Sequence, residues 1–144
     1  DAYRRLDRAE GAARHGDDGS ATREATVAST ILRRPLLSGV DNEWVDQARR
    51  RQHDAGYRCL TVLAAAWCRL GSHQLSATIA ESAIAVDPLR EVGYRLLAEA
   101  ELAQGDRGAA ARVLRRCEQM LRDELQVTPS PETVRLAETI RTHH

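Results

Sequence analysis

Hydrophobic residues recur along the chain at the spacing expected of helices that are apolar on one side. In the first stretch Tyr3, Leu6, Ala9 and Ala13 are three or four residues apart, which places them on one helix face. No segment shows a convincing strand pattern, so the predicted fold class is all-α. The same spacing predicts further helices over residues 21–32, 44–70, 72–86, 88–104, 107–125 and 131–141.

An internal repeat organises the later helices. At an offset of 34 residues the chain matches itself at Leu63 and Leu97, Ala64 and Ala98, Ala66 and Ala100, Gly71 and Gly105, and Ala77 and Ala111. This offset is the period of tetratricopeptide repeats, in which two helices are joined by a turn. Gly71 and Gly105 can adopt the left-handed conformation that ends the first helix of each pair. We therefore expect one tetratricopeptide-like, right-handed helical repeat domain over residues 1–144. Its expected parts are a degenerate first pair (1–33), two further pairs (44–86 and 88–125) and a capping helix (131–141).

The segment "DELQVTPSPET", residues 123–133, separates the capping helix from the helix before it. Pro129 forces the preceding residue towards an extended conformation. Ser130 is a good N-cap, Pro131 suits the first helical position, and Glu132 interacts favourably with the helix dipole. The sequence therefore predicts a rigid elbow that folds the last helix over the open end of the repeat.

Composition narrows the possible classes of function. The chain has 144 residues and a formal net charge of zero, so it has no strong global field for nucleic acid. All 21 basic residues are arginine, which indicates a GC-rich genome more than a need for guanidinium groups. No apolar run approaches the ~20 residues of a membrane span, and no signal peptide is visible. Because the chain opens with Asp1, we expect it to be a piece of a longer protein.

No catalytic or metal site is predicted, and neither is a cofactor. Cys59, Cys68 and Cys117 lack the spacing of a zinc site or a disulfide framework, and reduced cytosolic thiols are the simpler account. The histidines at 15, 53 and 73 share no metal-ligand spacing, and no glycine-rich phosphate loop is present. We therefore expect a protein that is not an enzyme.

Two long motifs resemble a known family. "DPLREVGYRLLAEAELAQGDRGAAARVLRRCEQMLRDELQVTPSPET", from residue 87, closely resembles the bacterial transcriptional activator domain of the Streptomyces antibiotic regulatory protein (SARP) family. Upstream, "RRPLLSGVDNEWVDQARRR" is similar to that family's loop and arginine-rich helix. Gln126 departs from the pattern, because the family usually has glycine there as a left-handed helix cap. We expect Gln126 to make this cap less comfortable, so that the local geometry differs.

The resemblance implies a function. In that family an N-terminal winged-helix domain binds promoter DNA, and the helical domain follows it. The helical domain is thought to mediate self-association, packing against the winged helix, and activation through RNA polymerase. The resemblance thus implies a cytoplasmic homodimer that contacts DNA mainly through a separate winged-helix domain. A free-standing tetratricopeptide-like adaptor, which binds a protein or peptide in its groove, is the alternative.

Repeat geometry suggests which residues contact a partner. The first helix of each pair lines the concave surface of tetratricopeptide folds. By repeat position this surface is expected to carry Arg58, Thr61, Ala65 and Arg69 in one unit, and Arg95, Glu99 and Leu102 in the next. For each arginine, a solvated surface or an internal ion pair is the alternative, although exposed pairs add only ~0.2–1 kcal/mol.

Two tryptophans and an arginine run complete the candidate residues. Trp67 lies mid-helix among alanines and is expected in the core. Trp44 follows a loop and could seal the core, which is favoured, or an interface with a partner. Arg49 and Arg50 could contact phosphate, but successive residues of a helix point about 100° apart and cannot form one clamp. A solvated face is the favoured interpretation of this run.

Overall fold

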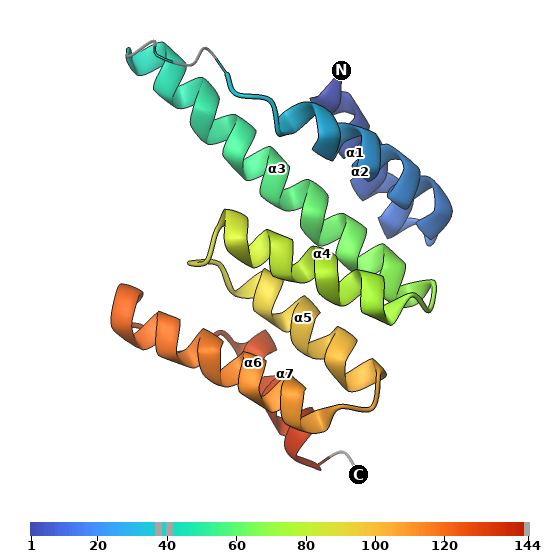
Figure 1. The fold of residues 1–144 in the computed structure, drawn as a ribbon, viewed down its shortest axis with the longest axis vertical. Helices are drawn as coiled ribbons and strands as arrows, with labels where there is room; N and C mark the ends of the chain where they lie inside the picture. The colour runs from blue at the N-terminus through green and yellow to red at the C-terminus, as the bar shows by residue number, and fades with distance from the viewer. Residues whose placement is uncertain (37–38, 40–41, 143–144) are drawn as a thin grey trace.

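The computed structural model describes residues 1–36, 39 and 42–142, and across these residues it is helical, which confirms the predicted fold class (Figure 1). Part of the connection before the long third helix, including residues 37–38 and 40–41, falls outside the described residues, as do 143 and 144. The α-helices are α1 (Ala2–Arg14), α2 (Asp18–Leu32), α3 (Glu43–Arg69), α4 (His73–Val86), α5 (Glu91–Ala103), α6 (Arg107–Met120) and α7 (Pro131–Thr142). A short π-helical turn, η1 (Leu121–Leu125), continues α6. None of the helices described is long and apolar enough to cross a membrane.

The helices form two layers. Each helix from α1 to α6 packs against the next along the chain, and α7 packs against α6. In addition α1 contacts α3, α3 contacts α5, and α5 contacts α7 (Figure 1). Within the described part of the chain α2, α4 and α6 make no such contacts with one another. The first helices of the pairs therefore share one layer, and α7 occupies the place in that layer where a further repeat would begin.

The turns within the three pairs are built in the same way. Gly16, Gly71 and Gly105 have positive φ angles of 79°, 90° and 84°. The residue after each glycine donates its backbone N–H to the carbonyl five residues back, at 2.8, 2.9 and 3.0 Å. This is the Schellman pattern, which satisfies the last carbonyls of a helix and favours glycine. The prediction for Gly71 and Gly105 is confirmed, and Gly16 adds a third copy.

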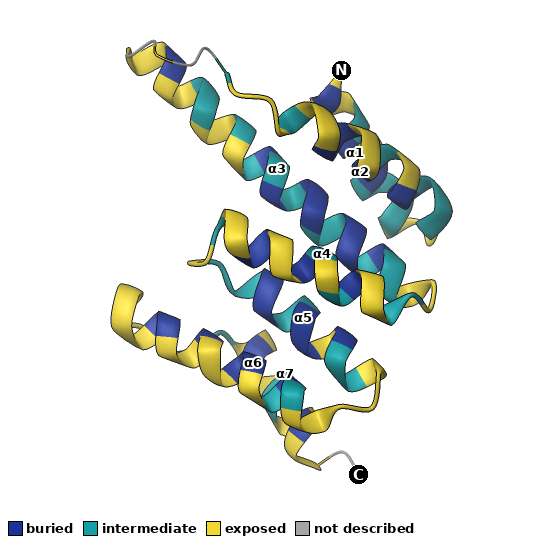
Figure 2. Ribbon diagram, in the orientation of Figure 1, coloured by how far each residue is buried: buried dark blue, intermediate teal, exposed yellow. Residues whose placement is uncertain are grey.

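Small residues form the helix contacts. Ala64, Ala98 and Ala110 are completely buried in the main core cluster, which lies between α3, α4, α5, α6 and α7 (Figure 2). The absence of a large side chain at these positions lets the helix backbones approach closely. Trp67 is half-buried and packs against the cluster that contains Ala9 and Leu63, which confirms its expected place in the core.

The favoured prediction for Trp44 is wrong, because this side chain is 68% exposed. The next residue, Val45, is only 2% exposed and takes the inward position. Since successive helix residues point about 100° apart, Trp44 is turned away from the core. The N-terminal end of α3 also projects beyond α1 and α2 (Figure 1).

The end of α6 corrects the expectation for Gln126. This residue adopts the left-handed conformation, with φ 53° and ψ 42°, so the cap that glycine usually provides is retained. Its side-chain Nε2 donates to the carbonyl of Asp123 at 3.0 Å, and its backbone N–H donates to the carbonyl of Leu121. The cap geometry is therefore preserved, although a non-glycine residue is strained in this region.

Candidate functional site

The "DPLRE" motif forms the connection between α4 and α5. Asp87 Oδ1 accepts the backbone N–H of Leu89 at 3.2 Å, which turns the chain. Arg90 donates to Asp54 of α3 at 2.9 Å, and its guanidinium lies 4.1 Å from the centre of the Tyr57 ring. The motif thus fixes the entry of α5 against α3.

A buried tyrosine completes this junction. Tyr57 is 1% exposed, and its hydroxyl oxygen accepts the backbone N–H of Gly93 at 2.9 Å. A Cβ on Gly93 would lie 3.0 Å from Cγ1 of Ile84 and 3.3 Å from the Tyr57 hydroxyl. Gly93 is therefore required for the close approach of α5 to α4 and α3.

The last residue of "DPLRE" holds the elbow. Glu91 Oε1 accepts hydrogen bonds from the Ser130 N–H at 3.0 Å, the Ser130 hydroxyl at 3.1 Å and the Thr133 hydroxyl at 2.7 Å. Thr133 is 1% exposed, and Arg95 also donates to its hydroxyl at 3.1 Å. Burial tends to raise the pKa of Glu91, but the hydrogen bonds from Thr133 and Ser130 outweigh it and the pKa is lowered. The motifs "DPLRE" and "PSPET" therefore meet in one network at the start of α7.

Two of the predicted groove arginines are held by carboxylates of other helices. Arg58 of α3 donates from Nε to Glu10 of α1 at 3.0 Å and from a terminal nitrogen to Asp54 at 3.4 Å. These partners, Glu10 first, raise its pKa. Arg69 donates to Asp18 of α2 at 2.9 Å. Both arginines therefore form internal ion pairs, which was the alternative interpretation. That they also contact a partner stays a prediction.

The other predicted groove residues lie on α3 and α5. The Thr61 hydroxyl donates to the Arg58 carbonyl at 3.0 Å, and Leu102 packs partly buried against the main core. Arg95 is engaged with the elbow, as described above. Glu99 keeps contact with solvent, but partial burial of its carboxyl raises its pKa, an effect that Arg95 opposes. Arg95 and Glu99 thus lie together on α5. They are separate from Arg58 and the carboxylates of Glu10 and Asp54 to which it donates.

The projecting end of α3 carries the remaining candidates. Arg49 donates to the carbonyl of Leu36 at 3.3 Å, whereas Arg50 is exposed and has no hydrogen bond or ion pair within the described residues. Arg51 lies over the ring of Tyr3, with 5.6 Å between its Cζ and the ring centre. Residues 44, 48 and 51 share one helix face by their spacing of four and three. We call Trp44, Arg51 and Tyr3 the tryptophan face.

The thiols are placed as core residues. Cys59 and Cys117 are completely buried, and burial raises their pKa to about 12 and to about 11. The Cys68 pKa is also raised by burial. A raised pKa disfavours the thiolate that nucleophilic chemistry needs. Among the residues described, no group of three or more His, Cys, Asp or Glu side chains is arranged to hold a metal ion.

The two layers and the elbow define this chain as an all-helical repeat domain closed by a docked terminal helix. Comparison with protein-family models matches residues 1–141 to the bacterial transcriptional activator domain. The chain belongs to this family, and it is a regulatory domain of the transcription-activator type. A search of curated proteins finds no match.

Proposed function

We propose that this chain is the interaction domain of a SARP-type activator that works in the bacterial cytoplasm. In this proposal it mediates self-association as a homodimer and contacts a winged-helix domain of the same protein and RNA polymerase. DNA is bound mainly by the winged helix. The observation that carries the proposal is the family match over residues 1–141, which is nearly the whole chain.

The tryptophan face is the surface that we assign to these contacts. Trp and Arg are enriched where proteins bind one another, and Trp is among the residues that contribute most to binding. Trp44 is 68% exposed, and Arg51, seven residues further along α3, lies over the ring of Tyr3. Because Tyr3 is two residues from Asp1, a domain that precedes residue 1 would be tethered close to this face.

The proposal is tested with the natural gene product in its host. We expect a polypeptide about 100 residues longer at its N-terminus, the size of a small domain. We also expect Trp44→Ser to reduce activation of a promoter reporter and to weaken dimerisation measured by light scattering. Leu75→Ser, which replaces a 43% exposed leucine on α4, is the matched control and should leave both unchanged. A native polypeptide of 16.0 kDa would instead support the adaptor.

A further inference from the structure

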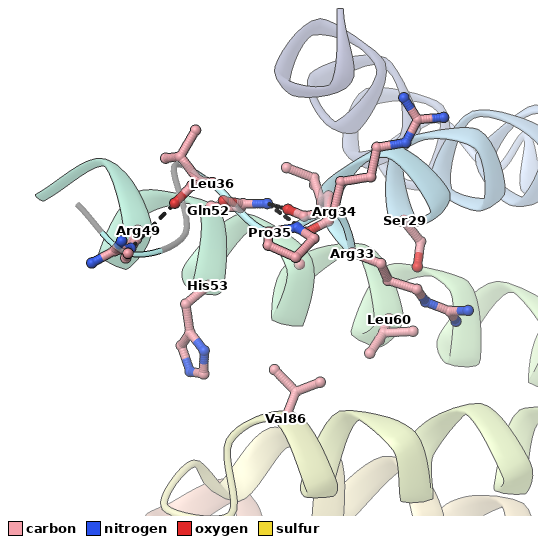
Figure 3. A pocket seen from close by; sticks show the side chains of 13 residues that line it. Ser29, Arg33, Arg34, Pro35, Leu36, Arg49, Gln52, His53, Leu60 and Val86 are labelled. Atoms are coloured by element: carbon pink, nitrogen blue, oxygen red, sulfur yellow. Dashed lines mark hydrogen bonds between the residues drawn. The ribbon is translucent and has the colours of Figure 1, made fainter. Parts of the chain in front are cut away.

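A pocket of about 490 Å³ opens between the end of α2, the middle of α3 and the end of α4 (Figure 3). Its volume lies within the ~300–1,000 Å³ of small-molecule sites. Much of its wall is apolar and is contributed by Leu32, Pro35, Leu60 and Val86. Gly56 also lines it, and a Cβ built on Gly56 meets no atom within 4 Å, so the pocket extends to the α3 backbone.

One end of the pocket carries a hydroxyl and a guanidinium group that have no side-chain partner among the described residues. Ser29 is only 6% exposed, yet its hydroxyl makes no hydrogen bond within the described residues. Arg33 is four residues further along α2, and its guanidinium has neither a hydrogen bond nor an ion pair to any described residue. Figure 3 shows the ends of both side chains on the same side of the pocket, close to Leu60. Among the described residues no buried side-chain nitrogen or oxygen lacks a hydrogen-bond partner, so the Ser29 hydroxyl still reaches solvent, and Arg33 is exposed. Both groups are therefore accessible from the pocket and can bind a ligand.

The charge of the lining indicates the sign of that ligand's charge. Among the described residues the lining includes three arginines and His53 but no Asp or Glu. Arg49 donates to the Leu36 carbonyl and the Arg34 side chain points away from the pocket in Figure 3, which leaves the Arg33 guanidinium at this end. His53 is 3.3 Å from Asp87, outside the lining. The Gln52 amide donates to the carbonyls of Leu32 and Arg34 at 2.8 and 2.6 Å. These two carbonyls at the end of α2 therefore already accept hydrogen bonds from Gln52. The Arg33 guanidinium has no partner among the described residues and can bind an anion.

We propose that this pocket binds a small organic anion with an apolar body. Its carboxylate or phosphate group accepts hydrogen bonds from the Ser29 hydroxyl and the Arg33 guanidinium. Its apolar body lies along Leu60 and Val86. The site goes beyond the proposed interaction function, because it requires neither a protein partner nor DNA.

The first experiment is a titration of the 144-residue chain followed by amide NMR spectra. The probes are octanoate, octyl phosphate and neutral 1-octanol. We expect saturable shifts at Ser29, Leu60 and Val86 with at least one anion, and binding of octanol at least about tenfold weaker, since a charge-assisted hydrogen bond contributes about that factor. The two anions distinguish a carboxylate from a phosphate ligand. Equal binding of octanol, or no saturable shift with either anion, would overturn the proposal.

Variants locate the binding at the pocket. Arg33→Gln should weaken anion binding about tenfold or more, and Ser29→Ala should weaken it by less. Arg34→Gln is the matched control, because Arg34 is the adjacent arginine and its side chain points away from the pocket in Figure 3. Gly56→Leu should fill the pocket and abolish binding while the circular dichroism spectrum stays helical. Equal losses for Arg33→Gln and Arg34→Gln, or undiminished binding by Gly56→Leu, would contradict the assigned site.

Discussion

Glu91→Ala tests whether one carboxylate holds the terminal helix in place. The change removes the acceptor of three hydrogen bonds, two of them from Ser130 and one from the buried hydroxyl of Thr133. A hydrogen bond to a charged group contributes about 1.5–3 kcal/mol. The three do not add, because Ser130 is only half-buried and can bond to water instead. Thr133 is buried, so its hydroxyl loses its 2.7 Å acceptor inside the protein and keeps, among the described residues, only the Ser130 hydroxyl at 3.3 Å.

We therefore expect Glu91→Ala to lower the free energy of unfolding by about 2–3 kcal/mol. For a chain of this size that corresponds to a melting temperature lower by about 6–9 °C, measured by circular dichroism. Hydrogen exchange of the α7 amides should accelerate more than that of α3. Glu118→Gln, an exposed glutamate on α6 without a hydrogen bond or ion pair to any described residue, is the control and should change the melting temperature by less than about 1 °C. Unchanged melting and unchanged α7 exchange in Glu91→Ala would refute the reasoning.

The Glu91 carboxylate should also make the free energy of unfolding depend on pH, and the sign of this dependence follows from its pKa. The pKa of Glu91 is lowered in the folded protein from its ordinary value of 4.5. A lowered pKa stabilises the fold fully above the unfolded value, and this contribution is lost as the pH falls through the folded value. The stability difference between the wild type and Glu91→Gln should therefore be constant above about pH 5 and shrink on acidification below 4.5. Urea unfolding from pH 3 to 7 measures it, and a difference that grows on acidification would contradict the assignment.

Three further changes probe the rest of the fold. Tyr57→Phe should lower the free energy of unfolding in urea by about 1–2 kcal/mol, because the buried N–H of Gly93 loses its acceptor; an unchanged midpoint would argue against that bond. Gln126→Gly should raise the free energy of unfolding by about 0.5–1 kcal/mol, because glycine adopts the left-handed conformation without strain; a lower melting temperature would contradict this. Iodoacetamide at pH 8 should leave Cys59 and Cys117 unmodified in the native protein, as followed by mass spectrometry, and should modify both in urea; rapid native modification would contradict their burial.

The sequence was informative where structure depends on nearby residues. The left-handed turns at Gly71 and Gly105 follow from hydrogen bonds that reach back five residues at most, so the glycine and the 34-residue offset predict them together. The backbone of the elbow is restricted in the same way by its own prolines, whereas the hydrogen bonds to Glu91 that hold it span about 40 residues and could not be predicted. For Gln126 the conformational preference led us to expect a different local geometry, but the left-handed cap is retained at the cost of strain, and the side-chain Nε2 donates to the Asp123 carbonyl.

Side-chain partners across helices could not be predicted. Arg58 and Glu10 are 48 residues apart, and Arg69 and Asp18 are 51 apart, so their pairing depends on how α1, α2 and α3 lie relative to one another. The pocket beside Ser29 has the same origin, because the ends of α2 and α4 and the middle of α3 enclose it. Helical periodicity assigns a residue to a face, but it does not tell what covers that face.

The motifs that carry the family resemblance maintain the scaffold. Glu91 of "DPLRE" binds Ser130 and Thr133 of "PSPET", and Arg90 fixes α5 to α3. These side chains are engaged within the domain, so the motifs specify the arrangement of the helices more directly than the choice of a partner. Specificity should then depend on residues outside the motif network. Among the described residues, Trp44, at 68% exposure, and the guanidinium of Arg33 are two such groups that could bind something else.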